Sequence, residues 1–493
     1  ESAIRGDSGQ QKLLDHASKI LQRSAAVVMF TVPGGGEVQV PLGRIPRLVT
    51  EMKKCLSSLG ASAADEELEA WACHVVESMS APSRSFHIVQ HAFDISAGAD
   101  SIGTLAAFFH DIIYYSADGG LSPAQEQVLK GIITEDGEGN VVLNEIDAEF
   151  DEPLSMTMEI FGFKARQVLN PFRGLNEFLS AAFAVRCLGH TLKLHQLAQI
   201  VTCIEATIPF RGKENGKSAE EFLFERLKRA NTSYELNLSE EDLSMGVKRA
   251  VNLANHDVEN FSTSDPSYFL SNTWDLLPES HASLRHTQGV KISDYALALK
   301  KTTDFLATLD PGVVFPSFRG EPREEVLFEK TELARKNLSI SLKYMHCKLL
   351  AICVLAALAE ETGGDAPVAV CIGDIPQNDS VSQSIENYLP APKVYHSAIV
   401  DEKVFDLLKN GRGRESTFDT KYSPLAAYLY SLIGDEGLNR SLEYLVLPIG
   451  QEGAKKLLAS LPRSVVRDIS LACAEISVTR ARKLRRIAEK YSD

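Results

Sequence analysis

Four side chains within residues 86–115 have the types and spacing of a metal site. In the segment FHIVQHAFDISAGADSIGTLAAFFHDIIYY, His87 and His91 lie four residues apart, and His110 directly precedes Asp111. Residues four apart share a face of a helix, so both imidazoles can point at one spot and a His-Asp pair on a second helix can meet them there. Imidazole nitrogens and a carboxylate oxygen suit a borderline to hard divalent ion. The stretch therefore favours metal-dependent hydrolysis as its chemistry.

Length and charge narrow the class of protein. The 493 residues are enough for a large core and for about two to four domains. The formal net charge of −15, from 66 acidic and 51 basic residues, argues against a general nucleic-acid binder, which needs positive surface to displace counterions. A local basic pocket for one small phosphate ester is still compatible with this charge.

Cysteine spacing and hydropathy indicate where the protein works. The eight cysteines are scattered without a CxxC pair, which predicts buried thiols in a reducing compartment rather than a disulfide frame or a zinc site. No uncharged apolar run reaches the roughly 18 residues that suggest a membrane span. We therefore expect a cytoplasmic protein that contacts no membrane; a homo-oligomer is compatible with these features.

Hydrophobic periodicity predicts a mainly α-helical chain in three segments. Residues 1–80 combine helices with a β-hairpin at 26–43 that turns at a run of three glycines. Residues 81–345 form a helical domain around the histidine stretch, and residues 346–493 are mostly helices and turns. A short strand is predicted at 368–374, where the sequence reads VAVCIGD.

The segment 116–174 differs in character from its surroundings. It contains the acidic, turn-rich pieces SADGGLSPAQEQ, EDGEGN and DAEFDEP, interrupted by short apolar runs. This composition predicts an insertion that caps the site or serves as an interaction surface. The acidic residues lack the central glycine and closing glutamate of a calcium loop, so a solvated loop is favoured.

An ordered set of motifs extends over about half of the chain. FHxxxH is followed by LAxxFHDIIY, NExxSA, IxAT, an aspartate in NHDVENF, and ARxNL. The set resembles the HD superfamily of metal-dependent phosphohydrolases, and within it the bacterial branch that opens with an aromatic-His-xxx-His signature. The resemblance implies an HD-type helical core, here with the N-terminal hairpin and an additional C-terminal helical region.

The resemblance also implies roles for particular residues. Matched position by position, it makes His91, His110, Asp111 and Asp257 the metal ligands. His87, one turn before His91, falls where cyclic-nucleotide phosphodiesterases of the superfamily place a proton donor for the leaving oxygen. A structural alternative stays open, in which the histidines beside the HD dipeptide are satisfied core residues.

Further residues are candidates for the substrate side of the site. Glu177 falls where some superfamily members keep an acidic residue near the metal, and Glu205 and Thr207 fall on the helix that lines the pocket. Arg211, together with Arg166 and Arg173, could clamp a phosphate, because a bidentate guanidinium suits phosphate oxygens. Surface ion pairs with the acidic insertion are an alternative use of these arginines.

The expected function is a phosphomonoesterase or phosphodiesterase acting on a small nucleotide-like or sugar-phosphate substrate. One divalent ion, Mn, Mg, Fe, Zn or Ni, would activate water as the nucleophile. Many relatives carry a further histidine after IxAT, where this chain has Pro209-Phe210, which argues against a second metal. The alternatives are a non-catalytic nucleotide sensor or scaffold built on an HD domain, and an HD-type di-iron oxygenase.

Overall fold

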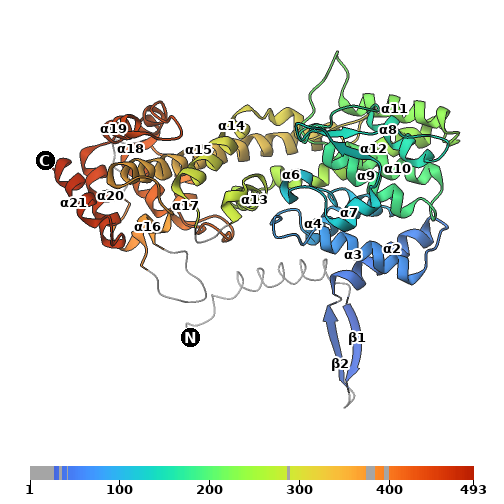
Figure 1. The fold of residues 1–493 in the computed structure, drawn as a ribbon, viewed down its shortest axis with the longest axis horizontal. Coiled ribbons are helices and arrows are strands. Elements are labelled where there is room, and N and C mark those ends of the chain that lie inside the picture. Colours follow the sequence, from blue (N-terminus) through green and yellow to red (C-terminus); the bar gives the residue numbers. More distant parts are fainter. Residues whose placement is uncertain are drawn as a thin grey trace, which may run out of the picture. The chain divides into compact units, whose positions relative to one another are not determined.

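The chain is mainly α-helical and divides into two compact units. The computed structural model describes residues 27–32, 36–41, 43–285, 289–373, 383–392 and 399–492. Unit 1 comprises Glu1–Asp257 and Pro316–Pro322, and unit 2 comprises Val258–Phe315 and Arg323–Asp493 (Figure 1). The prediction of a mainly α fold is confirmed. The predicted segment boundary after residue 345 lies inside one continuous helix, α15 (Glu324–Thr362), which belongs to unit 2.

Unit 1 is organised around helices that bury most of their surface. α10 contacts α5, α9 and α12, and the centre of the core contains Phe108, Phe109, Phe178 and Phe183. α9 is apolar on nearly all sides, as a helix surrounded by others must be. The helices outside the acidic segment are α2 (Arg44–Ser58), α3 (Asp65–Ser78), α4 (Val89–Ile95), α5 (Ser101–Phe109), α9 (Leu175–Leu188), α10 (Leu194–Ala206), α11 (Ala219–Ser233) and α12 (Glu240–Asp257).

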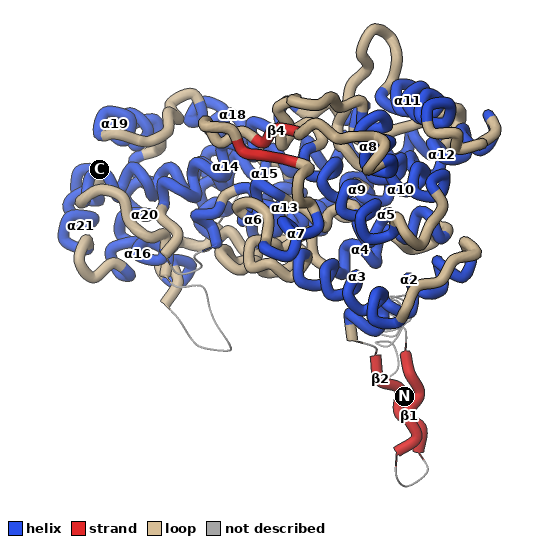
Figure 2. Tube along the Cα trace, turned by 45° about the vertical axis from the view of Figure 1, so that its right-hand side comes forward, coloured by secondary structure: helices blue, strands red, loops and turns tan. Residues whose placement is uncertain are grey.

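Unit 1 also contains two antiparallel strand pairs (Figure 2). β1 (Val27–Val32) pairs with β2 (Gly36–Pro41), which confirms the predicted N-terminal hairpin; its glycine turn lies mostly outside the described residues. The predicted insertion is ordered rather than a plain loop. It contains α6 (Tyr115–Asp118), α7 (Pro123–Val128), β3 (Ile133–Glu135) paired with β4 (Val141–Leu143), and α8 (Glu152–Phe161).

Unit 2 is built on α15, whose residues from Tyr344 to Ala359 are buried except for the partly exposed His346 and Ala356. The other α-helices of the unit are α13 (Pro266–Ser280), α14 (Ile292–Thr308), α16 (Ala369–Ile372), α17 (Glu402–Asn410), α18 (Pro424–Leu442), α19 (Gln451–Ser460), α20 (Arg463–Ile476) and α21 (Ala481–Lys490). Its short 3-10 helices are η1 (Glu259–Ser262), η2 (Ala282–Arg285), η3 (Pro311–Val313) and η4 (Ile385–Asn387). The strand predicted at 368–374 is wrong, because α16 occupies residues 369–372; residue 374 lies outside the described residues.

Two predictions from composition can be checked against the structure. All eight cysteines are free thiols and seven of them are buried, as the absence of paired motifs predicted. In the described part of the chain, α15 alone is long and apolar enough to cross a membrane, and 78% of its most apolar window is buried inside the protein. The apolar character of α15 is therefore accounted for by its central position in unit 2.

Candidate metal centre

The four predicted metal ligands converge at one point in unit 1. His91 lies on α4, His110 follows the last residue of α5, Asp111 comes next, and Asp257 ends α12. One ligand atom from each residue lies within 4.8 Å of the others. His110 Nε2 is 2.7 Å from Asp111 Oδ2, and His91 Nε2 is 3.0 Å from Asp257 Oδ1. We call these four residues the candidate metal centre.

Local structure explains why His110 presents Nε2 to this point. α5 begins at the N-cap Asp100, whose side chain accepts a hydrogen bond from the Gly103 N–H, and its apolar residues anchor it in the core. His110 Nδ1 lies 2.9 Å from the Ala107 carbonyl oxygen. A ring whose Nδ1–H donates to a carbonyl keeps its Nε2 lone pair available for a metal ion, and its orientation is held by the same bond.

The chemistry of the cluster fits a divalent ion. His110 is 1% exposed, and its Nε2 lies 2.7 Å from Asp111 Oδ2 and 3.7 Å from Asp257 Oδ1, within ion-pair distance but without the alignment of a hydrogen bond. In the same described part, the carboxylates of Asp111 and Asp257 form ion pairs with histidines and none with lysine or arginine. Two imidazoles and two carboxylates without a fixed positive charge form the donor set that such an ion requires.

Electrostatics within the centre strongly couple the four groups. Burial favours the neutral form of His110, but the Asp111 and Asp257 carboxylates outweigh burial and raise its pKa well above the ordinary value. Burial likewise opposes charge on Asp111 and Asp257, yet the neighbouring histidines lower the pKa of both carboxyls far below their usual range. Both carboxylates are therefore charged at neutral pH and ready to bind a cation.

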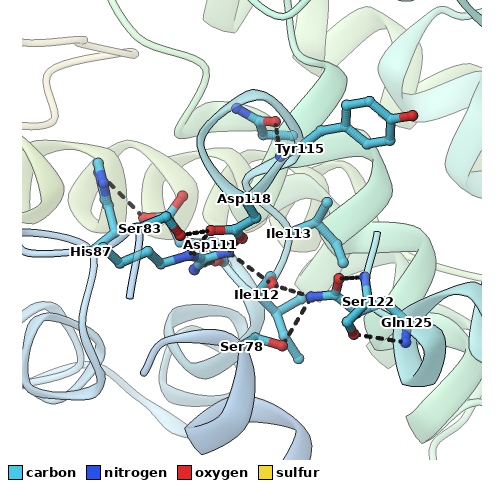
Figure 3. Close-up of polar contacts among 12 residues, drawn as sticks. Ser78, Ser83, His87, Asp111, Ile112, Ile113, Tyr115, Asp118, Ser122 and Gln125 are labelled. Atoms are coloured by element: carbon cyan, nitrogen blue, oxygen red, sulfur yellow. Dashed lines mark hydrogen bonds and ion pairs between the residues drawn. The ribbon is translucent and has the colours of Figure 1, made fainter. Parts of the chain in front are cut away.

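Arg84 holds the backbone of the His-Asp corner, a role that no sequence motif indicated. Its side chain is fully buried, Nη1 donates to the Asp111 carbonyl oxygen at 2.5 Å, and Nε donates to the Asp118 carboxylate at 3.1 Å. Gln125 Nε2 donates to the Ile112 carbonyl oxygen at 3.1 Å (Figure 3). Asp118 and Gln125 both belong to the predicted insertion, so this segment helps to build the site.

The NExxSA motif has a structural explanation on α9. Asn176 Oδ1 accepts a hydrogen bond from the Tyr115 N–H at 3.0 Å, and Ser180 Oγ accepts one from the Ile113 N–H at 3.1 Å. Both bonds hold the short segment that follows Asp111. The motif was recognised in the sequence, but only the fold shows that its polar residues fix the backbone beside the metal centre.

The two predicted catalytic residues lie around the centre. His87 Nε2 is 3.8 Å from Asp111 Oδ2, and its ring packs edge-on against Tyr114. Glu177 is partly buried, and its Oε2 has no hydrogen-bond partner among the described residues. Burial, reinforced by the charges of Asp111 and Asp257, raises the pKa of Glu177 to about 7.

The predicted substrate-binding residues are largely engaged with one another. Glu205 is buried and forms ion pairs with Arg211, at 2.7 Å, and with Arg226. Thr207 Oγ1 donates to the Ile204 carbonyl oxygen at 2.8 Å. The structure thus uses Glu205 and Thr207 inside the protein, while the positive charge of Arg211 acts on Glu177. Arg166, the second clamp candidate, pairs with exposed Glu145 of the insertion at 2.7 Å.

Comparison with family models, curated proteins and solved structures finds no match for this chain. The assignment of the candidate metal centre therefore rests on the sequence pattern and on the positions of the four side chains. Two observations on the described residues agree: four ligand atoms converge, and no lysine or arginine pairs with the two carboxylates.

Proposed function

We propose that unit 1 is an HD-type, metal-dependent phosphohydrolase that acts on a small nucleotide-like or sugar-phosphate ester. The observation that carries this proposal is the convergence of His91, His110, Asp111 and Asp257 on one point. A divalent ion bound by such a set supplies a water of lowered pKa and neutralises charge on a phosphoryl oxygen. The remaining requirements, a proton for the leaving group and a means of orienting water and substrate, fall to side chains around the centre.

His87 is the proton donor in this proposal. Its Nε2 is close to Asp111 without belonging to the four converging groups, and its side chain is 16% exposed. An imidazole titrates near neutral pH, so it can hold a proton and release it to a leaving oxygen. The edge-on contact with the Tyr114 ring limits the orientations that the imidazole can adopt.

Glu177 and Arg211 orient the groups that enter the site. The unpartnered Glu177 Oε2 is an acceptor for a water or substrate hydroxyl beside the two aspartates. Arg211 is held by Glu205 through a bidentate contact, so its guanidinium is pre-organised rather than free to turn. Its charge is positioned to attract the phosphate of an ester that reaches the centre.

Elemental analysis of the purified full-length protein, combined with a screen of generic and nucleotide phosphate esters, tests the proposal. The wild type should retain a divalent ion and hydrolyse at least one ester, and Asp111→Ala should lose both properties. Asp147→Ala, at an exposed carboxylate of the insertion, is the matched control and should keep both.

Each other outcome has a definite meaning. If wild type and Asp111→Ala bind the same ion and show the same activity, the ligand assignment is wrong. If the wild type holds the ion tightly but hydrolyses nothing across a broad panel, the phosphohydrolase proposal fails and a nucleotide-binding sensor replaces it. Iron content together with oxygen consumption would instead indicate an oxygenase.

A further inference from the structure

Unit 2 contains a cavity of about 420 Å³ that includes no residue of the candidate metal centre. Its walls come from α14, α15, α16, η4, the first turn of α18 and the loop that precedes α18. Small-molecule sites usually have volumes of about 300–1,000 Å³ with mainly apolar walls and a few grouped polar side chains. Here Ile352, Leu355 and Phe418 supply apolar wall, and Lys348, Asp419 and Ser423 supply polar wall.

The polar side of the cavity belongs to a buried charge cluster, which we call the Asp419 cluster: Asp419, Lys348 and Arg412. Lys348 Nζ lies 3.0 Å from Asp419 Oδ2 and 3.1 Å from Ser423 Oγ, and Arg412 Nη1 lies 3.2 Å from the same carboxylate oxygen. The three charged side chains are only 8%, 0% and 6% exposed for Lys348, Arg412 and Asp419. Two buried cations therefore share one carboxylate, which leaves one positive charge in excess.

The two cations are placed differently. Arg412 packs over the Trp274 ring at 4.3 Å, and its Nε has no acceptor among the described residues, so the cluster offers more donors than acceptors. Lys348, in contrast, lines the cavity. An excess charge at a buried site is costly unless an anion accompanies it. Asp419 lines the cavity as well, so Lys348 is the cation of the cluster that an anion in the cavity can reach.

The first turn of α18 adds positive potential to the same wall. Pro424, Leu425 and Ala426 line the cavity, and the N-cap Ser423 makes no side-chain capping bond to this turn. An uncapped helix start presents unpaired N–H groups and the positive end of the helix dipole. Glu386 and Glu415 also border the cavity, but both are exposed, where solvent screens their charge.

We propose that this cavity binds a small monocarboxylate whose carboxylate meets Lys348 and the start of α18 and whose apolar body lies against Ile352, Leu355 and Phe418. The excess positive charge of the Asp419 cluster favours a ligand with a carboxylate group. The apolar part of the wall favours a ligand whose remainder is apolar. A dianion would be less favoured, because the Asp419 cluster has one positive charge in excess and exposed glutamates lie at its border.

Binding of decanoate and of decylammonium to the full-length protein, measured by calorimetry, tests this inference. The two probes have the same chain and opposite charges, so apolar contact alone predicts equal affinity. We expect decanoate to bind at least about tenfold more tightly, because a hydrogen bond between charged groups discriminates by about that factor or more. Equal affinities in the wild type would overturn the proposal without the need for any variant.

Lys348→Met removes the charge from the cavity wall and leaves Asp419 paired with Arg412, so the charge of the cluster is balanced and the variant should fold. Its affinity for decanoate should fall at least about tenfold and its affinity for decylammonium should not fall. Lys409→Met, at an exposed lysine of α17, is the matched control. Unchanged decanoate affinity in Lys348→Met contradicts the proposal.

Hydrogen exchange locates the probe, since a carboxylate could also bind at the metal centre in unit 1. Decanoate should slow exchange in peptides from α15 and the start of α18, and Asp111→Ala should not alter this protection. Ala351→Leu, which adds bulk to the cavity wall while keeping Lys348, should also weaken decanoate binding. Protection confined to α4 and α5 would assign the probe to the metal centre and overturn the cavity proposal.

Discussion

Each unit contains one cluster of buried charged groups, and the two clusters differ in how their carboxylates are compensated by positive charge. The Asp419 cluster carries its own cations, and its carboxylate accepts hydrogen bonds from Trp274 and Tyr295 as well as from Lys348 and Arg412. The candidate metal centre has two carboxylates and two imidazoles, and no lysine or arginine pairs with these carboxylates in the described chain. A buried carboxylate needs a compensating charge. The carboxylate of the first cluster is compensated by lysine and arginine within the protein, whereas the carboxylates of the second require protons or a metal ion.

The largest expected effect is the loss of folding stability when the carboxylate of the Asp419 cluster is removed. Asp419→Asn leaves two buried cations without a counter-charge and should lower the free energy of unfolding of unit 2 by about 3–5 kcal/mol. Trp274 donates to Asp419 and therefore reports on this unit, so denaturant unfolding is followed by its fluorescence in a Trp71→Phe background. Asp406→Asn, at an exposed aspartate of α17, is the control. A loss no larger than in the control would show that the cluster contributes little.

Addition of a divalent ion should stabilise the candidate metal centre and leave the Asp419 cluster unchanged. At a free ion concentration of 100 times Kd, the gain for a site formed only in the folded state is about 2.7 kcal/mol. Hydrogen exchange should slow in peptides from α4, α5 and α12 but not in those from α15 and α18. Equal protection in both sets would contradict the distinction between the clusters.

Loss of the backbone support should weaken ion binding without removing a ligand. Arg84→Lys keeps the charge but loses the planar fork that contacts Asp111, Ile112 and Asp118. We expect metal affinity to fall by about 10- to 100-fold, the usual range for groups that orient ligands. Arg166→Lys, at an exposed surface pair, should have no effect. Competition with a fluorescent chelator measures both affinities.

The smallest expected effect is the release of protons when the metal ion binds. The pKa of His110 is raised in the metal-free protein, so its contribution to stability is fully present below the ordinary histidine pKa and is lost as pH rises through the raised value. The ion must displace this proton, so binding at neutral pH should release about one proton per ion and affinity should rise with pH. Calorimetry in buffers of different ionisation enthalpy counts the protons. Uptake or no release would contradict the coupling.

Parts of the site were predictable because they depend on local geometry. The i, i+4 spacing of His87 and His91 and the His110-Asp111 pair brought these residues to attention, but the prediction that His87 and His91 share one helix is wrong, because α4 begins only at Val89 and His87 lies in the bend before it. Asp257 was identified by resemblance, and its proximity to His91 depends on where α12 ends in the fold. The roles of Arg84 and Gln125 had no signal, because each contacts main-chain carbonyls that are distant in sequence.

Other predictions failed or changed where packing decided the outcome. The apolar run at 368–374 was predicted as a strand, but α16 forms there; short apolar runs do not distinguish the two structures. The role of Glu205 in binding substrate stays a prediction, and the structure adds that its carboxylate pairs with Arg211 and Arg226 within unit 1. A side chain's partner depends on the three-dimensional arrangement, which periodicity does not specify.

By itself, the sequence determined that the chain is mainly helical and that a hairpin lies near the start of the described residues, and it pointed to the histidines and the His-Asp pair as ligand-type side chains. Only the tertiary structure decided which charged groups share a site. Among the described residues it paired Asp419 with a lysine and an arginine, and Asp111 and Asp257 with histidines alone, because ion pairs form between residues up to 166 positions apart, whose contact no local pattern encodes.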